Sequence, residues 1–285
     1  MLMLTEAAIP APLQQISHPP KQLFHRGASL EDLLSRPRVS IIGSRSVSAY
    51  GRQVTQKLAM ELSKQGIVII SGLALGVDAI AHKAALDAGG LTIAVLPSPV
   101  NRIYPSTNVA LANRILEQGG ALLSEYESEN FEQAYKSYFI ARNRLVAGLS
   151  QAVLITEAAV KSGSLHTARF ALEQGKDVLA VPGDITRIGS VGTNNLIRAG
   201  AIPVTSYLDV LHSLGLEEHH SAPADIKGRN QHEQIVLDLL LRGTNEGDSL
   251  LKASRLTASE FNQVLTMLEI GGKIRSLGSN RWSLY

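Results

Sequence analysis

Two motifs in this sequence have the residue types of an anion-binding site, and each follows an apolar run. They are Gly43, Ser44 and Arg45, and then Ser162, Gly163, Ser164 and Thr167. Small residues at such points let the next helix present free backbone N–H groups, and the helix dipole favours negative charge there. Arg45 adds a planar, permanently charged group that suits a phosphate. The motifs therefore predict a phosphate-binding site.

A third motif, KSYFIARNRLVAGLS, surrounds the start of a predicted helix. Its candidate site residues are Lys136, Phe139, Arg142, Asn143 and Arg144. Phe139 is either a core residue or a surface on which a nucleic-acid base stacks. Arg142 and Arg144 flank Asn143 and cannot share a helix face. One of them is therefore a candidate for an ion pair with Glu125 or Glu157.

The stretch SGLALGVDAIAH holds residue types that could be mistaken for a catalytic triad. Ser71, Asp78 and His82 lie there, but no nucleophile elbow precedes the serine. We interpret Asp78 as an acid at a helix start and His82 as a structural hydrogen-bonding group. The sequence also has no P-loop, no acidic cluster of a two-metal nuclease and no cysteine. We predict no catalytic residues, no metal site and no cofactor.

These motifs need a scaffold that brings them to one edge. From residue 39 onward, apolar runs alternate with helical patterns. Strands are expected at 39–43, 67–71, 91–96, 120–124, 152–156 and 177–181, and helices at 49–65, 76–88, 108–118, 138–149 and 164–174. Strands that are apolar throughout are buried on both faces, as in a parallel sheet. The prediction is an α/β, doubly wound, mostly parallel sheet that binds ligands at the carboxyl ends of its strands.

The remaining segments differ in composition from this domain, 39–212. Residues 1–38 are proline-rich and irregular, and we expect an arm anchored by Leu23 and Phe24. Residues 213–231 are polar and predict a linker. Residues 232–285 carry a helical pattern at 232–242, a T-x-x-E capping box at 257–260 and a hairpin signal at 278–280. This last segment predicts a small winged-helix domain.

Composition limits the class of protein further. The formal net charge is only +2 and 45% of the residues are hydrophobic, so a packed core is expected and any anion site must come from local clustering. No apolar stretch approaches the roughly 20 residues that span a bilayer. The first residues lack the features of a signal peptide. We expect a soluble, cytoplasmic protein without a membrane partner.

Taken together, the motifs resemble those of the DNA-processing protein A family (DprA, also called Smf). They are IIGSR…YG, SGLALGVDAIAH, IYPSTN, LLSEY, FIARNRLVAGLS, EAAVKSGSLHTA and VPGD…GTNNLI. The resemblance implies an extended Rossmann-like domain that binds single-stranded DNA without sequence preference, followed by a winged helix. It also implies a homodimer that protects incoming strands in natural transformation and loads the RecA recombinase onto them.

The same resemblance assigns roles to residues. It implies that Arg45 and Lys136 hold backbone phosphates and that Phe139 meets a base face. Backbone and hydroxyl donors of the groove would come from Gly43, Ser44, Ser162, Gly163, Ser164 and Thr167. Arg142, Asn143 and Arg144 either contact the DNA strand or stabilise the edge of the binding site.

Two other functions stay open. Phosphoribohydrolases of the lysine-decarboxylase-like type have related pockets and a P-G-G-x-G-T-x-x-E motif. Here Pro182-Gly183 is separated from Gly192-Thr193, and no glutamate follows at that spacing. A small-nucleotide sensor would use the same pocket. In the winged helix, the helix ASEFNQVLTMLE has two acids and no base, which favours a protein contact over DNA reading.

Overall fold

The computed structural model describes residues 2–5, 8–129, 131–217, 228–241, 243–278 and 280–284. Two compact units can be separated, Met1–His219 and His220–Tyr285. Of the linker expected at 213–231, residues 218–227 lie outside the described residues. Leu214 and Leu216 pack against the core of the first unit.

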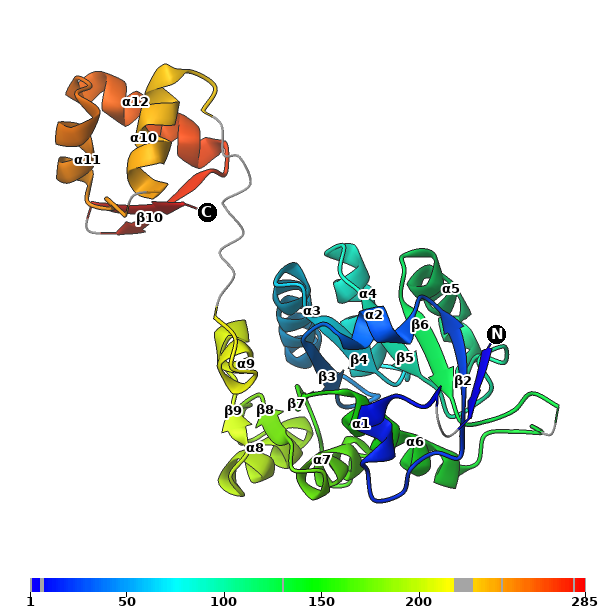
Figure 1. The fold of residues 1–285 in the computed structure, drawn as a ribbon. Coiled ribbons are helices and arrows are strands. Elements are labelled where there is room, and N and C mark those ends of the chain that lie inside the picture. The colour runs from blue at the N-terminus through cyan, green and yellow to red at the C-terminus, as the bar shows by residue number, and fades with distance from the viewer. Residues whose placement is uncertain are drawn as a thin grey trace. The chain divides into compact units, whose positions relative to one another are not determined.

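A nine-stranded sheet forms the centre of the first unit, in the order β1-β2-β6-β5-β4-β3-β7-β8-β9 (Figure 1). Its parallel strands are β3 (Arg38–Ile42), β4 (Val68–Ser71), β5 (Thr92–Val95), β6 (Ala121–Ser124), β7 (Ala152–Ile155), β8 (Asp177–Ala180) and β9 (Ile202–Pro203). The predicted α/β, doubly wound, mostly parallel sheet is confirmed.

The arm is not irregular, and this expectation was wrong. It contains β1 (Leu2–Thr5), α1 (Ala11–Gln14), β2 (Gln22–Gly27) and α2 (Leu30–Leu34). β2 pairs antiparallel with β6 and with β1, so the arm extends one edge of the sheet. Leu23 and Phe24 on β2 are buried, as expected of anchors. The proline-rich flanks hide this short strand from pattern analysis because they interrupt its periodicity.

Helices cover both faces of the sheet (Figure 1). Along β3 and β4, Ile41 and Ile69 face one core, and Ile42 and Ile70 face the other, because side chains alternate along a strand. Helices α3 (Ala49–Lys64) and α4 (Val77–Asp87) cover the first core, and α5 (Val109–Glu117) lies beside them. Helices α1, α6 (Lys136–Leu149) and α7 (Ser164–Glu173) cover the second core. Helices α8 (Val191–Arg198) and α9 (Tyr207–Ser213) complete the unit.

The second unit has its own core, built on Val236, Phe261 and Leu268. Its elements are α10 (Gln231–Leu241), α11 (Gly247–Ser254), α12 (Ala258–Ile270), β10 (Ile274–Gly278) and β11 (Arg281–Leu284). The capping box is present at Thr257. Three helices and an antiparallel hairpin form the expected winged helix. Over the described residues of both units, every helix is too short or too polar to cross a lipid bilayer.

A cationic groove at the switch point of the sheet

The chain changes direction across the sheet at β3. From β3 it continues through β4, β5 and β6 on one side, and it returns to β7 on the other side. The loops that follow β3 and β7 therefore separate at the carboxyl edge, where open α/β sheets leave a crevice for ligands. The Ser44 N–H donates to the Glu157 carbonyl oxygen at 2.8 Å and holds the two loops together at their base.

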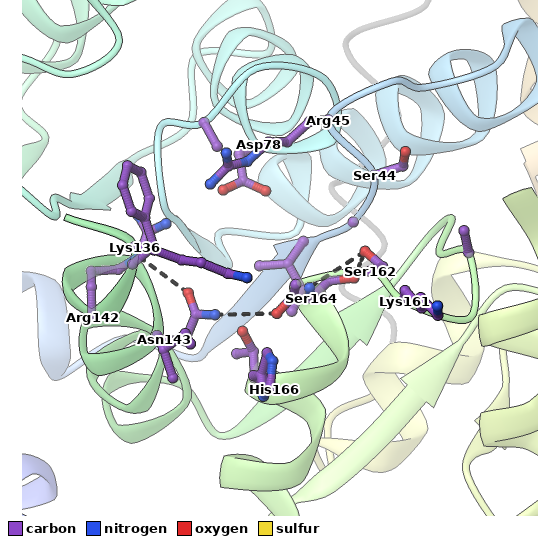
Figure 2. A pocket seen from close by; sticks show the side chains of 18 of the residues that line it. Ser44, Arg45, Asp78, Lys136, Arg142, Asn143, Lys161, Ser162, Ser164 and His166 are labelled. Atoms are coloured by element: carbon purple, nitrogen blue, oxygen red, sulfur yellow. Dashed lines mark hydrogen bonds between the residues drawn. The ribbon is translucent and has the colours of Figure 1, made fainter. Parts of the chain in front are cut away.

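A hollow of about 700 Å³ opens at this point, and we call it the groove. All predicted site residues except Arg144 line it: Gly43, Ser44, Arg45, Lys136, Phe139, Arg142, Asn143, Ser162, Gly163, Ser164 and Thr167. In Figure 2, Lys136 reaches into the groove from α6, while Arg45 and Asp78 lie together on another side. The fold thus brings together motifs that are more than a hundred residues apart in the sequence.

The loop that carries Arg45 is fixed by close backbone contacts. The Val77 N–H at the start of α4 donates to the Ser44 carbonyl oxygen at 3.1 Å. Gly76 has φ +79°, and a Cβ there would overlap the carbonyl oxygens of Ser44 and Arg45. Only glycine fits both the backbone angle and the space. Gly76 is therefore what lets α4 approach this loop.

Arg45 also contacts an aromatic pair. Its guanidinium carbon lies 4.9 Å from the ring centre of Phe139, within the range of a cation–π interaction. Tyr104 meets Phe139 edge to face, with ring centres 5.4 Å apart. The charge of Arg45 thus lies beside a π surface, the combination that proteins use to hold both the phosphate and the base of a single strand.

The opposite wall is the start of α7. The hydroxyls of Ser162 and Ser164 lie 2.7 Å apart, and the Asn143 side chain donates to the Gly163 carbonyl oxygen at 3.3 Å (Figure 2). These bonds fix the turn that leads into the helix. The positive end of the α7 dipole and the serine hydroxyls face the groove, so they can add donors for an anion.

Arg142 forms the floor of the groove rather than an exposed contact. It is only 4% exposed, and its Nη1 donates to the carbonyl oxygens of Gly72 and, at 2.6 Å, Val95. Asp78 lies beside it and accepts the Gly72 N–H at 3.1 Å. Burial lowers the pKa of Arg142 to about 10, and burial raises the pKa of Asp78 while the nearby Arg142 opposes that rise. The pair ties the ends of β4 and β5 to α6.

His82 lies deeper, one turn after Asp78. Its Nδ1 lies 2.6 Å from the Thr92 hydroxyl, which itself donates to the Ile69 carbonyl oxygen. Nδ1 is therefore the protonated nitrogen. Burial, with the charge of Arg142, lowers the pKa of His82 to about 3. A neutral, fully buried histidine fits the structural interpretation of this residue.

Arg144 lies outside the groove lining. Its guanidinium makes two bonds to the Glu125 carboxylate, at 2.6 and 2.9 Å, and the two side chains are 13% and 16% exposed. This is one of the ion pairs that the sequence left open. Arg142 and Arg144 point to different sides because two residues along a helix differ by about 200°.

Other residues of the groove lining were not predicted as binding residues, and among them are Asp78, Tyr104, Lys161 and His166. All four lie in motifs that the sequence analysis quotes. Lys161 directly precedes the Ser-Gly-Ser turn, and His166 follows it, so proximity to that turn was the available signal. Arg45, Lys136 and Lys161 are exposed, whereas the one carboxylate of the lining, Asp78, is buried. The accessible wall is therefore positively charged.

A mostly parallel sheet with a cationic groove at its switch point defines an α/β protein of Rossmann type. Over the described residues, no cluster of three or more histidine, aspartate or glutamate side chains could hold a metal ion.

The chain belongs to the DNA recombination-mediator protein A family, whose model matches residues 1–215; a DprA winged-helix model matches residues 220–280. It is 42% identical over 215 residues to Smf of Escherichia coli, covering 75% of this chain but only 57% of that protein. It is 43% identical over 202 residues to DprA of Streptococcus pneumoniae, covering 71% of this chain and 70% of the relative.

Two solved structures agree with this assignment. DprA from Streptococcus pneumoniae aligns with a TM-score of 0.69 and 40% identity, covering 76% of this chain and 75% of that one. A structure that concerns the single-stranded DNA binding mode of DNA processing protein A from Helicobacter pylori aligns with a TM-score of 0.66 and 39% identity, covering 74% and 95%.

Proposed function

We propose that the chain binds single-stranded DNA in the groove, without preference for sequence, and carries out no catalysis there. The observation that carries this proposal is the composition of the accessible wall. Arg45, Lys136 and Lys161 supply positive charge, the start of α7 supplies N–H and hydroxyl donors, and Phe139 supplies a π surface. None of these groups distinguishes one base from another, because phosphates and base faces are common to all nucleotides.

The arrangement of these groups around the groove supports a single strand as the ligand. Phe139 and Arg45 lie on one side of the groove and the Ser-Gly-Ser turn lies on the other, so a backbone can run between them. A binding mode of single-stranded DNA is described for the Helicobacter pylori relative, which supports the same ligand here. The Asp78–Arg142 pair is buried and held by backbone bonds, so the carboxylate of the groove lining is not exposed to act as a general acid or base.

The experiment is a titration of a fluorescently labelled thymidine oligonucleotide, read by anisotropy at several salt concentrations. Binding should weaken with salt by about 0.7 log units per log unit of salt for each phosphate neutralised. Arg45→Ala should lower the affinity and reduce the slope. Wild-type binding that is absent, or unchanged by salt and by this substitution, would contradict the proposal. A matched control is Arg198→Ala, because Arg198 lies at the end of α8 and outside the groove lining.

We further propose that the protein acts as a homodimer that protects incoming strands during natural transformation and loads RecA onto them. Membership of a recombination-mediator family supports this role. The test is RecA-dependent strand exchange on DNA coated with a single-strand binding protein. The wild type should shorten the lag before exchange, and Arg45→Ala should not. Sedimentation of the full chain measures the oligomeric state.

A further inference from the structure

A second hollow lies where the strands of the sheet begin, at the edge opposite to the groove. We call it the arm hollow, because α1 and the turn after it form one wall. Its volume is about 410 Å³, and its lining residues are Ala11, Pro12, Gln15, Ile16, Arg38, Ser150, Gln151, Gln174 and Lys176. This is within the size range of small-molecule sites.

Two cations dominate the arm hollow, and both are held at the carboxyl end of α6. The Lys176 ammonium donates to the carbonyl oxygens of Ala147 and Gly148, each at 2.6 Å. The Arg38 Nε donates to the Leu149 carbonyl oxygen at 2.6 Å. Three successive carbonyls thus fix both charges. Such contacts are ordinary caps of a helix end.

Helix capping alone does not balance this charge. The carboxyl end of a helix is equivalent to about half of a negative elementary charge. Here it faces two full positive charges, and no carboxylate lines the hollow. Burial lowers the pKa of Lys176 to about 8, with a contribution from the nearby Arg38. The two cations are therefore partly desolvated, close to one another and without an acidic partner.

The hollow also offers unused hydrogen-bonding groups. Arg38 uses Nε and Nη1 on carbonyl oxygens of the chain, whereas its Nη2 has no partner among the described residues. Gln15 and Gln151 add amide groups at the wall, and the Gln151 Oε1 accepts the Arg38 N–H at 2.9 Å. A ligand that combines an anion with a polar body would meet the free Arg38 Nη2 and the exposed amides of Gln15 and Gln151.

We propose that the arm hollow binds a phosphate-bearing anion of about the size of a nucleoside monophosphate. Arg38 and Lys176 take the phosphate, and the amide side chains of Gln15 and Gln151 meet the polar body of the ligand. The phosphate can come from a free nucleotide or from a DNA strand, since both present the same group. This site is distinct from the groove and does not depend on the function proposed for the groove.

The test uses the full chain with the groove disabled by Arg45→Ala and Lys136→Ala, so that phosphate binding in the groove does not contribute. Inorganic phosphate and deoxyadenosine monophosphate are titrated by isothermal calorimetry. We expect one saturable site. Gln151→Glu keeps the acceptor for the Arg38 N–H and places a carboxylate beside the two cations, so it should weaken binding at least tenfold. Gln15→Glu tests the same point from the arm, should Gln151→Glu disturb the fold.

The matched control is Gln56→Glu, an equal charge change at an exposed position on α3. It should leave binding unchanged. A thymidine oligonucleotide added to the groove-disabled protein identifies the source of the phosphate: displacement of the mononucleotide assigns the hollow to DNA, and no displacement assigns it to a free nucleotide. Absence of saturable binding, or binding that survives both Gln15→Glu and Gln151→Glu, would overturn the proposal.

Discussion

The guanidinium carbon of Arg45 lies 4.9 Å from the ring centre of Phe139, so the loop after β3 and the first turn of α6 meet through a cation–π contact. Arg45 is proposed to meet a phosphate and Phe139 a base, and this contact couples the two side chains physically. We therefore expect a bound strand to contact them together.

This coupling predicts non-additive effects on DNA affinity. Arg45→Ala and Phe139→Leu should each weaken binding of a thymidine oligonucleotide by about 1–3 kcal/mol, the usual cost of losing one stacking or charge contact. The double variant should lose less than the sum, because each single change already releases the other side chain. Anisotropy titrations of all four proteins form the double-mutant cycle. Full additivity would show that the contact does not organise the site.

Lys161 lies in the motif EAAVKSGSLHTA but was not predicted as a binding residue, so it provides a separate test of the accessible wall. Lys161→Ala should weaken DNA binding by about twofold to tenfold and reduce the salt slope by about 0.7, because one phosphate would lose its partner. Lys64→Ala is the control, since Lys64 is exposed at the end of α3 and pairs with Glu61. Equal slopes for the wild type and Lys161→Ala would remove this residue from the binding site.

Arg144 should matter for stability and not for binding. Arg144→Ala leaves the Glu125 carboxylate without its bidentate partner at 16% exposure, which should cost about 2 kcal/mol in the free energy of unfolding. Its DNA affinity should stay within about twofold of the wild type. Urea unfolding followed by circular dichroism, together with anisotropy, measures both quantities. A large loss of affinity in a stably folded variant would restore Arg144 as a contact of the strand.

Two glycines with similar backbone angles should respond differently to alanine. Gly66 has φ +77° with open space around it, whereas Gly76 has φ +79° and the loop of Arg45 against it. Gly66→Ala should cost about 1 kcal/mol in stability from backbone strain alone. Gly76→Ala should cost about 2 kcal/mol beyond that and should also weaken DNA binding, because the Ser44–Arg45 backbone must move. Equal effects of the two changes would show that the loop adapts freely.

We expect His82 to make the first unit less stable in acid. Its pKa is lowered to about 3 from 6.5, so between these values the unfolded chain binds a proton that the folded chain excludes. Stability therefore falls as pH drops below about 6.5, by about 1.4 kcal/mol per pH unit. Comparing about pH 7.5 with about pH 5, the wild type should lose about 2 kcal/mol more than His82→Gln.

Circular dichroism is the suitable measurement for this comparison. Trp282 is the only tryptophan and lies in the second unit, so its fluorescence reports on the winged helix. The same pH dependence in both proteins would exclude His82 as the source.

The sequence predicts the parallel part of the fold well, because a strand buried on both faces leaves a continuous apolar run followed by small polar residues. Gly43 and Arg45 are recognisable for that reason. β2 is not, because a short antiparallel strand that ends in exposed residues lacks such a run. The orientations of Arg142 and Arg144 could not be derived either. Both are arginines on one helix, and only packing decides which one faces the Gly72 carbonyl and which one Glu125.

Lys161 and His166 show another limit. A charged residue beside a turn is usually just solvated, and its contribution depends on which loops the fold brings opposite to it. Here the opposite loop belongs to β3, more than a hundred residues earlier in the chain. No local pattern contains that information.

The burial of Arg142 has a consequence for how this protein can vary. Its bonds to the ends of β4 and β5 make the floor of the groove part of the framework, so a substitution there alters folding and ligand contact at once. Arg45, Lys136 and Lys161 are exposed, and apart from the contact of Arg45 with Phe139 their replacement changes little packing. Changes in ligand affinity are therefore expected to come from substitutions of these exposed residues, while Arg142 is kept constant because the protein needs it to fold.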